Sequence, residues 1–216
     1  MLTPSRFSST ALLGAFLVFL SPCIGLAQAN DAEDEPLPLN DENVVFLYES
    51  RAPEKANDEV FAYAMSEEFR DAKEEFTRYD IIQELKPQIK EKLSKVDAAQ
   101  TVSLTIAGRQ LSEYDFDRQA FPVDVGDVPY ITYEQGYDVK ISNAEEMSEL
   151  PVPLETARQL ANDLQESRQV EYVVIGVVKG VEREGLTSTP RKIVEIEATR
   201  LVVKFLNGRE VGALDL

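Results

Sequence analysis

Residues 170–178 read VEYVVIGVV, the most apolar of the strands that the sequence predicts. A continuous run of this length, rich in Val and Ile, predicts a strand near the middle of a sheet, because buried strands lose the regular alternation of polar and apolar residues. We therefore expect this strand to be central in the sheet.

Two further strands are expected after the central one. Residues 192–205 form a long strand whose alternation shifts phase near Arg200, and residues 209–214 return as the last strand. Between them stands Asn207-Gly208, the strongest hairpin signal of the chain, because a type I′ turn needs positive φ at both central residues. This part of the chain predicts antiparallel strand pairs.

Three strands and a helix are expected before the central strand. Residues 101–106 alternate with period two, residues 111–123 form a longer strand with a bulge near Gln119, and residues 137–141 mark a third strand. A helix over residues 154–164 follows two prolines, which suit a first helical turn.

Two amphipathic helices are expected to precede these strands. Asn57 caps a helix that reaches Tyr79, and residues 81–96 continue with a helical period that Pro87 is expected to kink or break. The apolar stripe of the first helix recurs every three or four residues and predicts packing against the core. It consists of Phe61, Met65, Phe69, Ala72, Phe76 and Tyr79.

This order of elements predicts one α+β domain over residues 57–216. We expect an antiparallel sheet of about five to six strands, with the two N-terminal helices and the mid-chain helix packed on one face. Residues 30–56 are acidic and contain prolines, which is typical of a flexible leader. Within the leader, Val44–Tyr48 is a short apolar run and a candidate edge strand.

Residues 1–29 have the pattern of a cleavable export signal. Arg6 precedes the apolar run ALLGAFLVFL, and Ala27-Gln28-Ala29 gives the small-x-small pattern for cleavage before Asn30. The sequence thus predicts a periplasmic or secreted protein without a stable membrane span in its mature form.

A lipid anchor is the alternative for this segment. Cys23 follows Leu20 at the spacing of a lipobox, but Pro22 stands directly before it, where a small and flexible residue is usual. We therefore favour release over anchoring. Cys23 is the only cysteine, so the mature chain is expected to have no thiol and no disulfide.

Composition excludes several kinds of chemistry. The 216 residues carry a formal net charge of −17 and include no His and no Trp. An acidic surface repels phosphate backbones, so we expect no nucleic-acid partner. Serine, cysteine and zinc catalysis need imidazole or thiol groups, and neither GxSxG nor SxxK occurs. P-loop and dinucleotide glycine motifs are absent too, and we expect no cofactor.

Carboxylates are the remaining chemical groups of interest. Glu113, Asp115 and Asp117 occupy alternate positions of the strand expected over residues 111–123, so they share one face and are candidate ligands for a metal. Ca²⁺ accepts such oxygen ligands. A solvated strand face explains the same spacing, and no calcium-binding loop motif supports the metal hypothesis.

A small basic spot is a second candidate feature. It would consist of Arg70, Lys73 and Arg78 on the first helix together with Arg118. The simpler interpretation is that the helical residues pair with glutamates one turn away.

Two stretches resemble a known family. One is Tyr114-Asp115-Phe116 with Gln119-Ala120-Phe121-Pro122, and the other is YVVIG at residues 172–176 followed by the Asn207-Gly208 hairpin. Together they resemble a family of exported bacterial proteins classed as a domain of unknown function, over about residues 57–214. The resemblance implies no catalytic residues.

The sequence therefore predicts an exported, non-enzymatic protein that interacts with a protein or a small ligand in the bacterial cell envelope. Two alternatives remain: a hydrolase that uses only carboxylates, with or without Ca²⁺, and a carrier of an apolar ligand. An interaction module should show an exposed apolar patch or an open sheet edge. A hydrolase should show facing acids in a cleft, and a carrier an enclosed apolar cavity.

Overall fold

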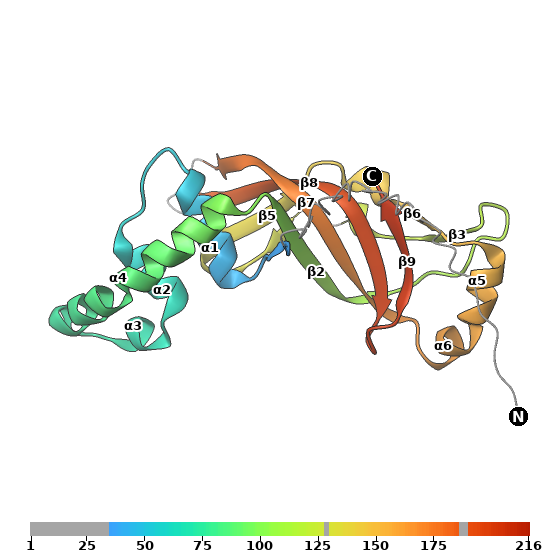
Figure 1. Cartoon of the computed structure of the whole chain (residues 1–216), viewed down its shortest axis with the longest axis horizontal. Helices are drawn as coiled ribbons and strands as arrows, with labels where there is room; N and C mark the ends of the chain where they lie inside the picture. The colour runs from blue at the N-terminus through green and yellow to red at the C-terminus, as the bar shows by residue number, and fades with distance from the viewer. Residues whose placement is uncertain (1–34, 128–129, 186–189) are drawn as a thin grey trace, which may run out of the picture. The chain divides into compact units, whose positions relative to one another are not determined.

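Two long antiparallel strands, β7 (Gln169–Glu184) and β8 (Arg191–Phe205), form the centre of the protein (Figure 1). The computed structural model describes residues 35–127, 130–185 and 190–216, so the expected export signal, with Ala27, Ala29 and Asn30, lies outside them. The run VEYVVIGVV lies in β7, between β2 and β8, as expected of a central strand. Its alternate residues Val170, Tyr172 and Val174 are fully buried.

Among the residues that the structure describes, the main sheet has seven strands in the order β1-β2-β7-β8-β5-β4, with β9 also pairing with β8. The parallel pairs β1–β2 and β5–β8 make the sheet mixed. The α+β class is thus confirmed, but the expectation of a wholly antiparallel sheet of five to six strands is wrong. The reason is that β5 reaches β8 through a long crossover that includes two helices and β7, and not through a hairpin. The remaining strands are β1 (Leu37–Pro38), β2 (Thr101–Gln110), β4 (Ile131–Thr132), β5 (Tyr137–Ile141) and β9 (Glu210–Asp215).

The expected long strand over residues 111–123 is wrong, because the chain turns within it. The carboxylate of Asp115 accepts hydrogen bonds from the backbone N–H groups of Asp117 and Arg118, and Gln119 has a positive φ of 53°. Only β3 (Ala120–Pro122) remains a strand, and it pairs with β6 (Glu149–Pro151) in a separate two-stranded sheet. Short 3₁₀ helices lie at η1 (Val125–Asp127), η2 (Glu134–Gly136) and η3 (Ala144–Met147).

The apolar run Val44–Tyr48 is helical, so the candidate edge strand is wrong. It lies in α1 (Asp41–Arg51), where Asn40 caps the helix by accepting a hydrogen bond from the Asn43 N–H at 2.8 Å. All residues from Asn43 to Glu49 are buried. A helix that is buried on every side has no apolar stripe, so its sequence shows no helical periodicity. The folded unit therefore begins before residue 57.

The first expected helix is divided in three: α2 (Asp58–Met65), α3 (Glu67–Asp71) and the start of α4 (Glu75–Ala98). Asn57 caps α2 as expected, but the Ser66 side chain accepts from the Phe69 N–H at 3.1 Å and starts a new helix. These breaks rotate the aromatic stripe. Phe61 and Phe69 are buried, whereas Phe76 is 83% exposed.

The sequence predicts a kink or a break near Pro87, and the break is not formed, because α4 continues through this residue. Pro87 is exposed, so water can solvate the backbone carbonyl of Gln83 that the missing N–H leaves free. The buried face of α4, with Ile81, Ile89 and Val96, holds the helix against the core.

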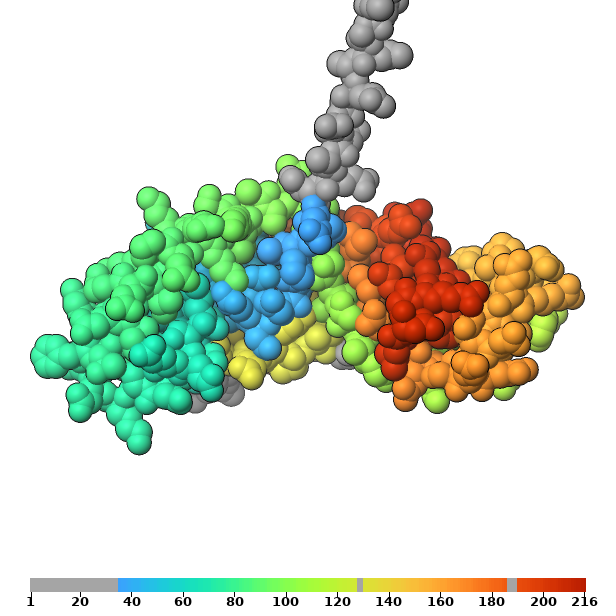
Figure 2. Space-filling view, turned by 60° about the horizontal axis from the view of Figure 1, so that its bottom comes forward, coloured from blue at the N-terminus to red at the C-terminus, as the bar shows by residue number. Residues whose placement is uncertain are grey.

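The mid-chain helix is present as two short helices, α5 (Leu154–Gln159) and α6 (Ala161–Glu166). They lie at one end of the sheet, whereas α1 to α4 lie at the other (Figures 1 and 2). The expectation that all helices pack together on one face is therefore wrong. Within the described ranges, no helix has the length and apolar character needed to cross a membrane.

The hairpin at Asn207-Gly208 is present, but its turn differs from the expected type. Gly208 has a positive φ of 83°, whereas Asn207 does not lie in the left-handed region. The Gly208 N–H donates to the Phe205 carbonyl at 2.8 Å, which fits a type I turn followed by a left-handed glycine.

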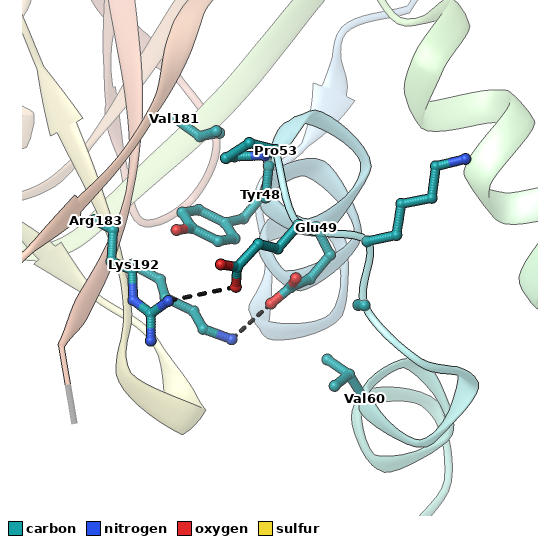
Figure 3. A pocket seen from close by; sticks show the side chains of 11 residues that line it. Tyr48, Glu49, Pro53, Val60, Val181, Arg183 and Lys192 are labelled. Carbon is teal, nitrogen blue, oxygen red and sulfur yellow. Dashed lines mark hydrogen bonds and ion pairs between the residues drawn. The ribbon is translucent and has the colours of Figure 1, made fainter. Parts of the chain in front are cut away.

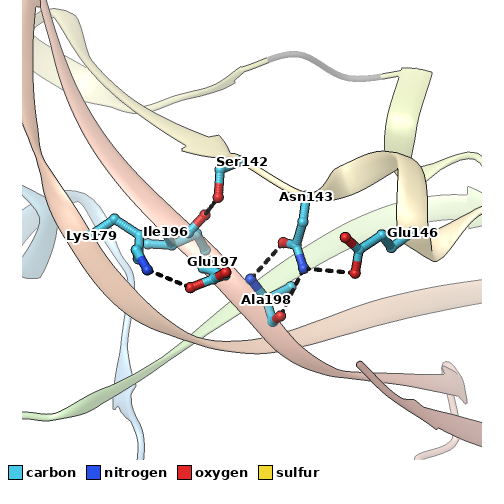
Figure 4. A network of polar contacts seen from close by, with 7 residues as sticks. All are labelled: Ser142, Asn143, Glu146, Lys179, Ile196, Glu197 and Ala198. Atoms are coloured by element: carbon cyan, nitrogen blue, oxygen red, sulfur yellow. Dashed lines mark hydrogen bonds and ion pairs between the residues drawn. The ribbon is translucent and has the colours of Figure 1, made fainter.

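Asn143 joins the two strands that share one edge of β8. β5 pairs with β8 up to Ile196, and β9 pairs with it from Arg200. Between them, the Ala198 N–H donates to the Asn143 side-chain oxygen at 2.8 Å, and the Asn143 amide donates to the Ala198 carbonyl at 3.0 Å (Figure 4). The Asn143 side chain thus satisfies the backbone N–H and C=O groups of Ala198, which lies between the residues of β8 that pair with β5 and those that pair with β9.

Candidate functional site

Three side chains from distant parts of the sequence form a buried polar cluster. Glu49 comes from the end of α1, Tyr137 from the start of β5 and Lys192 from β8, where it pairs with Tyr137 in register. The Lys192 ammonium donates to Glu49 at 2.6 Å and to the Tyr137 hydroxyl at 2.8 Å. The Tyr137 hydroxyl in turn donates to Glu49 at 2.5 Å. Glu49 and Tyr137 are only 8% and 1% exposed, whereas the Lys192 side chain is 29% exposed, so two buried groups are satisfied by each other and by a partly exposed ammonium group.

The surroundings of the cluster fix the protonation of Tyr137. Burial, followed by the hydrogen bond to Glu49, raises the pKa of Tyr137, so its hydroxyl keeps the proton that it donates. Lys192 also lies 4.5 Å from the centroid of the Tyr137 ring and 5.7 Å from that of Tyr48. These contacts hold the ammonium group in one place.

A first cavity of about 410 Å³ opens beside the cluster (Figure 3). Its cations are Lys55, Arg183 and Lys192, and its acids are Glu49 and Glu54. Arg183 and Glu54 form an exposed ion pair at 3.7 Å. The other lining residues are Tyr48, Ala52, Pro53, Ala56, Val60 and Val181.

A second cavity of about 390 Å³ shares Val60 and Lys192 with the first. It adds Arg78, whose guanidinium lies 4.5 Å from the centroid of the Phe69 ring. Among the described residues, neither Arg78 nor Lys55 has a carboxylate within 4.0 Å, and the Nε of Arg78 is buried without a hydrogen-bond partner. The pairing of Arg78 with a glutamate one turn away is therefore not formed. The other lining residues are Asn57, Glu59, Tyr63, Gln135 and Tyr137.

The candidate metal ligands lie elsewhere and do not form a strand face. Asp115 holds the turn described above, and Glu113 and Asp117 are exposed. In the part of the chain that the structure describes, no three acidic residues lie close enough to hold a metal ion.

The basic spot expected from the sequence is not assembled either. Arg118 forms ion pairs with Asp115 and Glu149, next to the small sheet. Arg70 instead donates to the Tyr63 carbonyl at 3.0 Å on the helical side of the protein.

No local motif in the sequence marks this cluster, so it is not predictable from sequence patterns. Glu49, Tyr137 and Lys192 are spread over more than 140 residues. The one available signal was a charged residue directly after the apolar run Val44–Tyr48, because a buried charge needs a partner.

Next to the cluster, Asp138 is a second buried carboxylate, with a side chain 3% exposed. Arg191 donates to it at 2.8 Å and Thr132 at 2.7 Å. Burial by itself raises the pKa of Asp138, but these hydrogen bonds outweigh burial, and its pKa is lowered. A lowered pKa means that the folded state favours the charged carboxylate.

The replacement Asp138→Asn should therefore change how stability depends on pH. At pH 7 we expect a loss of about 1–3 kcal/mol in the free energy of unfolding, because a charge-assisted hydrogen bond is lost. The wild type has this stabilisation above the ordinary Asp pKa of about 3.9 and loses it as pH falls through the lowered pKa. The difference in free energy of unfolding between the wild type and the variant should therefore disappear below about pH 4. Urea unfolding from pH 7 to pH 2 measures this. Asp117→Asn, at an exposed side chain, is the control, and an equal gap at all pH values would contradict the prediction.

Comparison with known proteins gives one family match. A family model described as a domain of unknown function (DUF4852) matches residues 56–163, which is half of the chain. The matched stretch includes Arg78 and Tyr137 and ends before β7 and β8, which supply Arg183 and Lys192. The resemblance to a domain of unknown function is thus confirmed. No curated protein and no solved structure matches the chain.

Proposed function

The chain belongs to the family described as a domain of unknown function (DUF4852), and since that description names no activity, we propose its function from the site itself. The protein is an exported, non-enzymatic binding protein of the bacterial cell envelope. Its ligand carries a negative charge and binds at the two cavities that meet at Lys192. The observation that carries this proposal is the gathering of Lys55, Arg78, Arg183 and Lys192 around these cavities, in a chain of net charge −17.

The charges of the first cavity favour an anionic group. Glu49 is already paired with Lys192 and accepts a hydrogen bond from the Tyr137 hydroxyl, so the pair adds little net charge and Glu49 adds little repulsion. The pair between Arg183 and Glu54 is exposed, with Glu54 88% exposed, and such pairs contribute little to stability. A ligand carboxylate or phosphate can therefore replace Glu54 beside Arg183 at low cost, and Lys55 is a further cation of the same cavity.

The charged lining of the two cavities argues against the two alternative functions, a carboxylate hydrolase and a carrier of an apolar ligand. A carboxylate hydrolase needs two acids whose environments differ, whereas Glu49 and Glu54 are each paired with a cation, and Tyr137 keeps its proton. An apolar-ligand carrier would enclose its cavity between the sheet and the aromatic stripe of the first helix, whereas Phe76 and Tyr79 of that stripe are 83% and 59% exposed. Charged groups line both cavities, which supports binding of a polar ligand.

Binding is tested by isothermal titration with citrate, N-acetylglutamate and inorganic phosphate. We expect at least one probe to bind, and Lys55→Gln with Arg183→Gln to weaken it at least about tenfold, because each lost charge-assisted hydrogen bond amounts to about 1.5 kcal/mol or more. Arg158→Gln is the matched control, since Arg158 is also exposed and paired with a glutamate but lies outside both cavities. If no probe binds, or the control weakens binding equally, the proposal fails.

Export is the second half of the proposal, and the pattern of residues 1–29 supports it. Protein recovered from the periplasm or the medium is expected to begin at Asn30. N-terminal sequencing measures this, and recovery only from the cytoplasm with an intact N-terminus would refute export.

A further inference from the structure

β7 is longer than the neighbour that covers its outer edge. Its last pair with β2 is Val177 with Thr101, and beyond that point it pairs only with β8. Among the described residues, no backbone hydrogen bond reaches the other edge of residues 178–184. Lys179 and residues 182–184 are exposed, so this edge is open to solvent and able to accept another strand.

The open edge lies beside the first cavity. Val181 and Arg183 of β7 line that cavity and pair in register with Val194 and Lys192 of β8. Both side chains therefore lie on the sheet face that carries the polar cluster (Figure 3). A strand added at about 4.8 Å from β7 would place every second side chain on this face, next to Val181 and Arg183.

The lining of the cavity sets the chemistry of such a strand. Pro53 lies near Val181 (Figure 3), and the cations Lys55, Arg183 and Lys192 line the cavity together with the acids Glu49 and Glu54, which pair with Lys192 and Arg183. We propose that the free edge of β7 binds an extended segment of another protein that carries an apolar and an acidic side chain two positions apart. This inference rests on the proposed function, because the acidic side chain is the anionic group that the cavity receives.

A second copy of this chain is a poor occupant of the edge. Lys179 and Glu182 to Glu184 place charges along it, and the register shift between Val178 and Gly180 adds a bulge. Charges and bulges disfavour the long, regular pairing that two copies of this strand would need more than they disfavour the addition of a short segment. Two chains of net charge −17 also repel each other. The edge is therefore suited to a short segment with one acidic side chain placed at the cavity.

The test uses a fluorescent nine-residue peptide of alternating Thr and Val in which the central Val is replaced by Glu. We expect it to bind the full-length mature protein, and replacing the peptide Glu by Gln to weaken binding about tenfold. Each peptide bond is then N-methylated in turn. If the peptide pairs with β7 as a strand, N-methylation should weaken binding about tenfold at every second position and change it little at the positions in between, because alternate N–H groups face β7. An equal change in affinity at every methylated position would overturn the proposal.

Two comparisons separate this inference from the proposed function. If citrate or N-acetylglutamate binds and depends on Lys55 and Arg183, but the methylation pattern is flat, only the strand inference fails. If neither the small anions nor the peptide bind, both fail. Light scattering at rising protein concentration tests the other occupant, and a dimer that the peptide dissociates would assign the edge to a second copy and overturn the inference.

Discussion

Replacing Gly176 by alanine should lower the free energy of unfolding by about 3 kcal/mol or more. Gly176 of β7 lies opposite Ala198 of β8, at a shift of register between the two strands. A Cβ atom at this position would lie 2.5 Å from the carbonyl oxygen of Glu197 and 3.2 Å from the Cα of Ala198. Both are backbone atoms of the longest strand pair, so neither can swing away as a side chain would.

The expected size of this effect depends on which atoms must move to relieve the strain. Overpacking in a core usually costs about 1–3 kcal/mol, and relief here requires a movement of two central strands, which places the cost at the upper end or beyond. That is a large part of the total stability of about 5–15 kcal/mol that a folded domain has. We therefore expect part of the Gly176→Ala protein to be unfolded even without denaturant, and Gly176→Ser to behave in the same way.

Gly180→Ala is the matched control for this prediction. Gly180 lies in the same strand, no atom lies within 4 Å of a Cβ built on it, and its φ is not positive. Alanine there should leave stability unchanged or raise it by about 0.4–1 kcal/mol, because the unfolded chain loses freedom. Urea unfolding of both variants and the wild type measures the difference. Equal stability of the Gly176 and Gly180 variants would show that the strands tolerate the added atom.

Elements with a local signature could be predicted from the sequence. The central position of β7, the strand at β5 and the hairpin at Asn207-Gly208 each follow from a pattern within fewer than ten residues. Elements that depend on distant contacts could not. Val44–Tyr48 is too short and too uniformly apolar to reveal whether it is a strand or a helix, and only its burial on all sides makes α1 possible.

The candidate site was beyond prediction for the same reason. Asp115 was expected on a strand because its neighbours alternate, but its carboxylate accepts two backbone N–H groups and turns the chain instead. Glu49 and Lys192 lie in two elements whose contact depends on how α1 packs on the sheet. Parallel pairing of β5 with β8 then adds Tyr137 beside Lys192. No pattern along the sequence indicates that these three side chains lie in contact.

Replacing Lys192 by methionine should destabilise the protein by about 3 kcal/mol, because Glu49 would remain buried without its cation. The Glu49 side chain is 7% exposed and that of Lys192 is 29% exposed, which places the loss at the lower end of the range for broken buried pairs. Tyr137 still donates one hydrogen bond to Glu49, but a neutral hydroxyl does not balance the carboxylate charge.

A double-mutant cycle distinguishes this cause from a simple packing defect. Glu49→Gln removes the charge that needs a partner, so Glu49→Gln with Lys192→Met should be less destabilised than the sum of the two single variants, by about 1 kcal/mol or more. Lys95→Met is the control, since Lys95 pairs with Glu91 on the surface of α4, where both side chains are about two-thirds exposed, and its loss should stay within about 0.5 kcal/mol. Urea unfolding at pH 7 gives all the values. Strict additivity of the cycle would mean that Lys192 stabilises the fold through its aromatic contacts with Tyr48 and Tyr137, and not through the charge of Glu49.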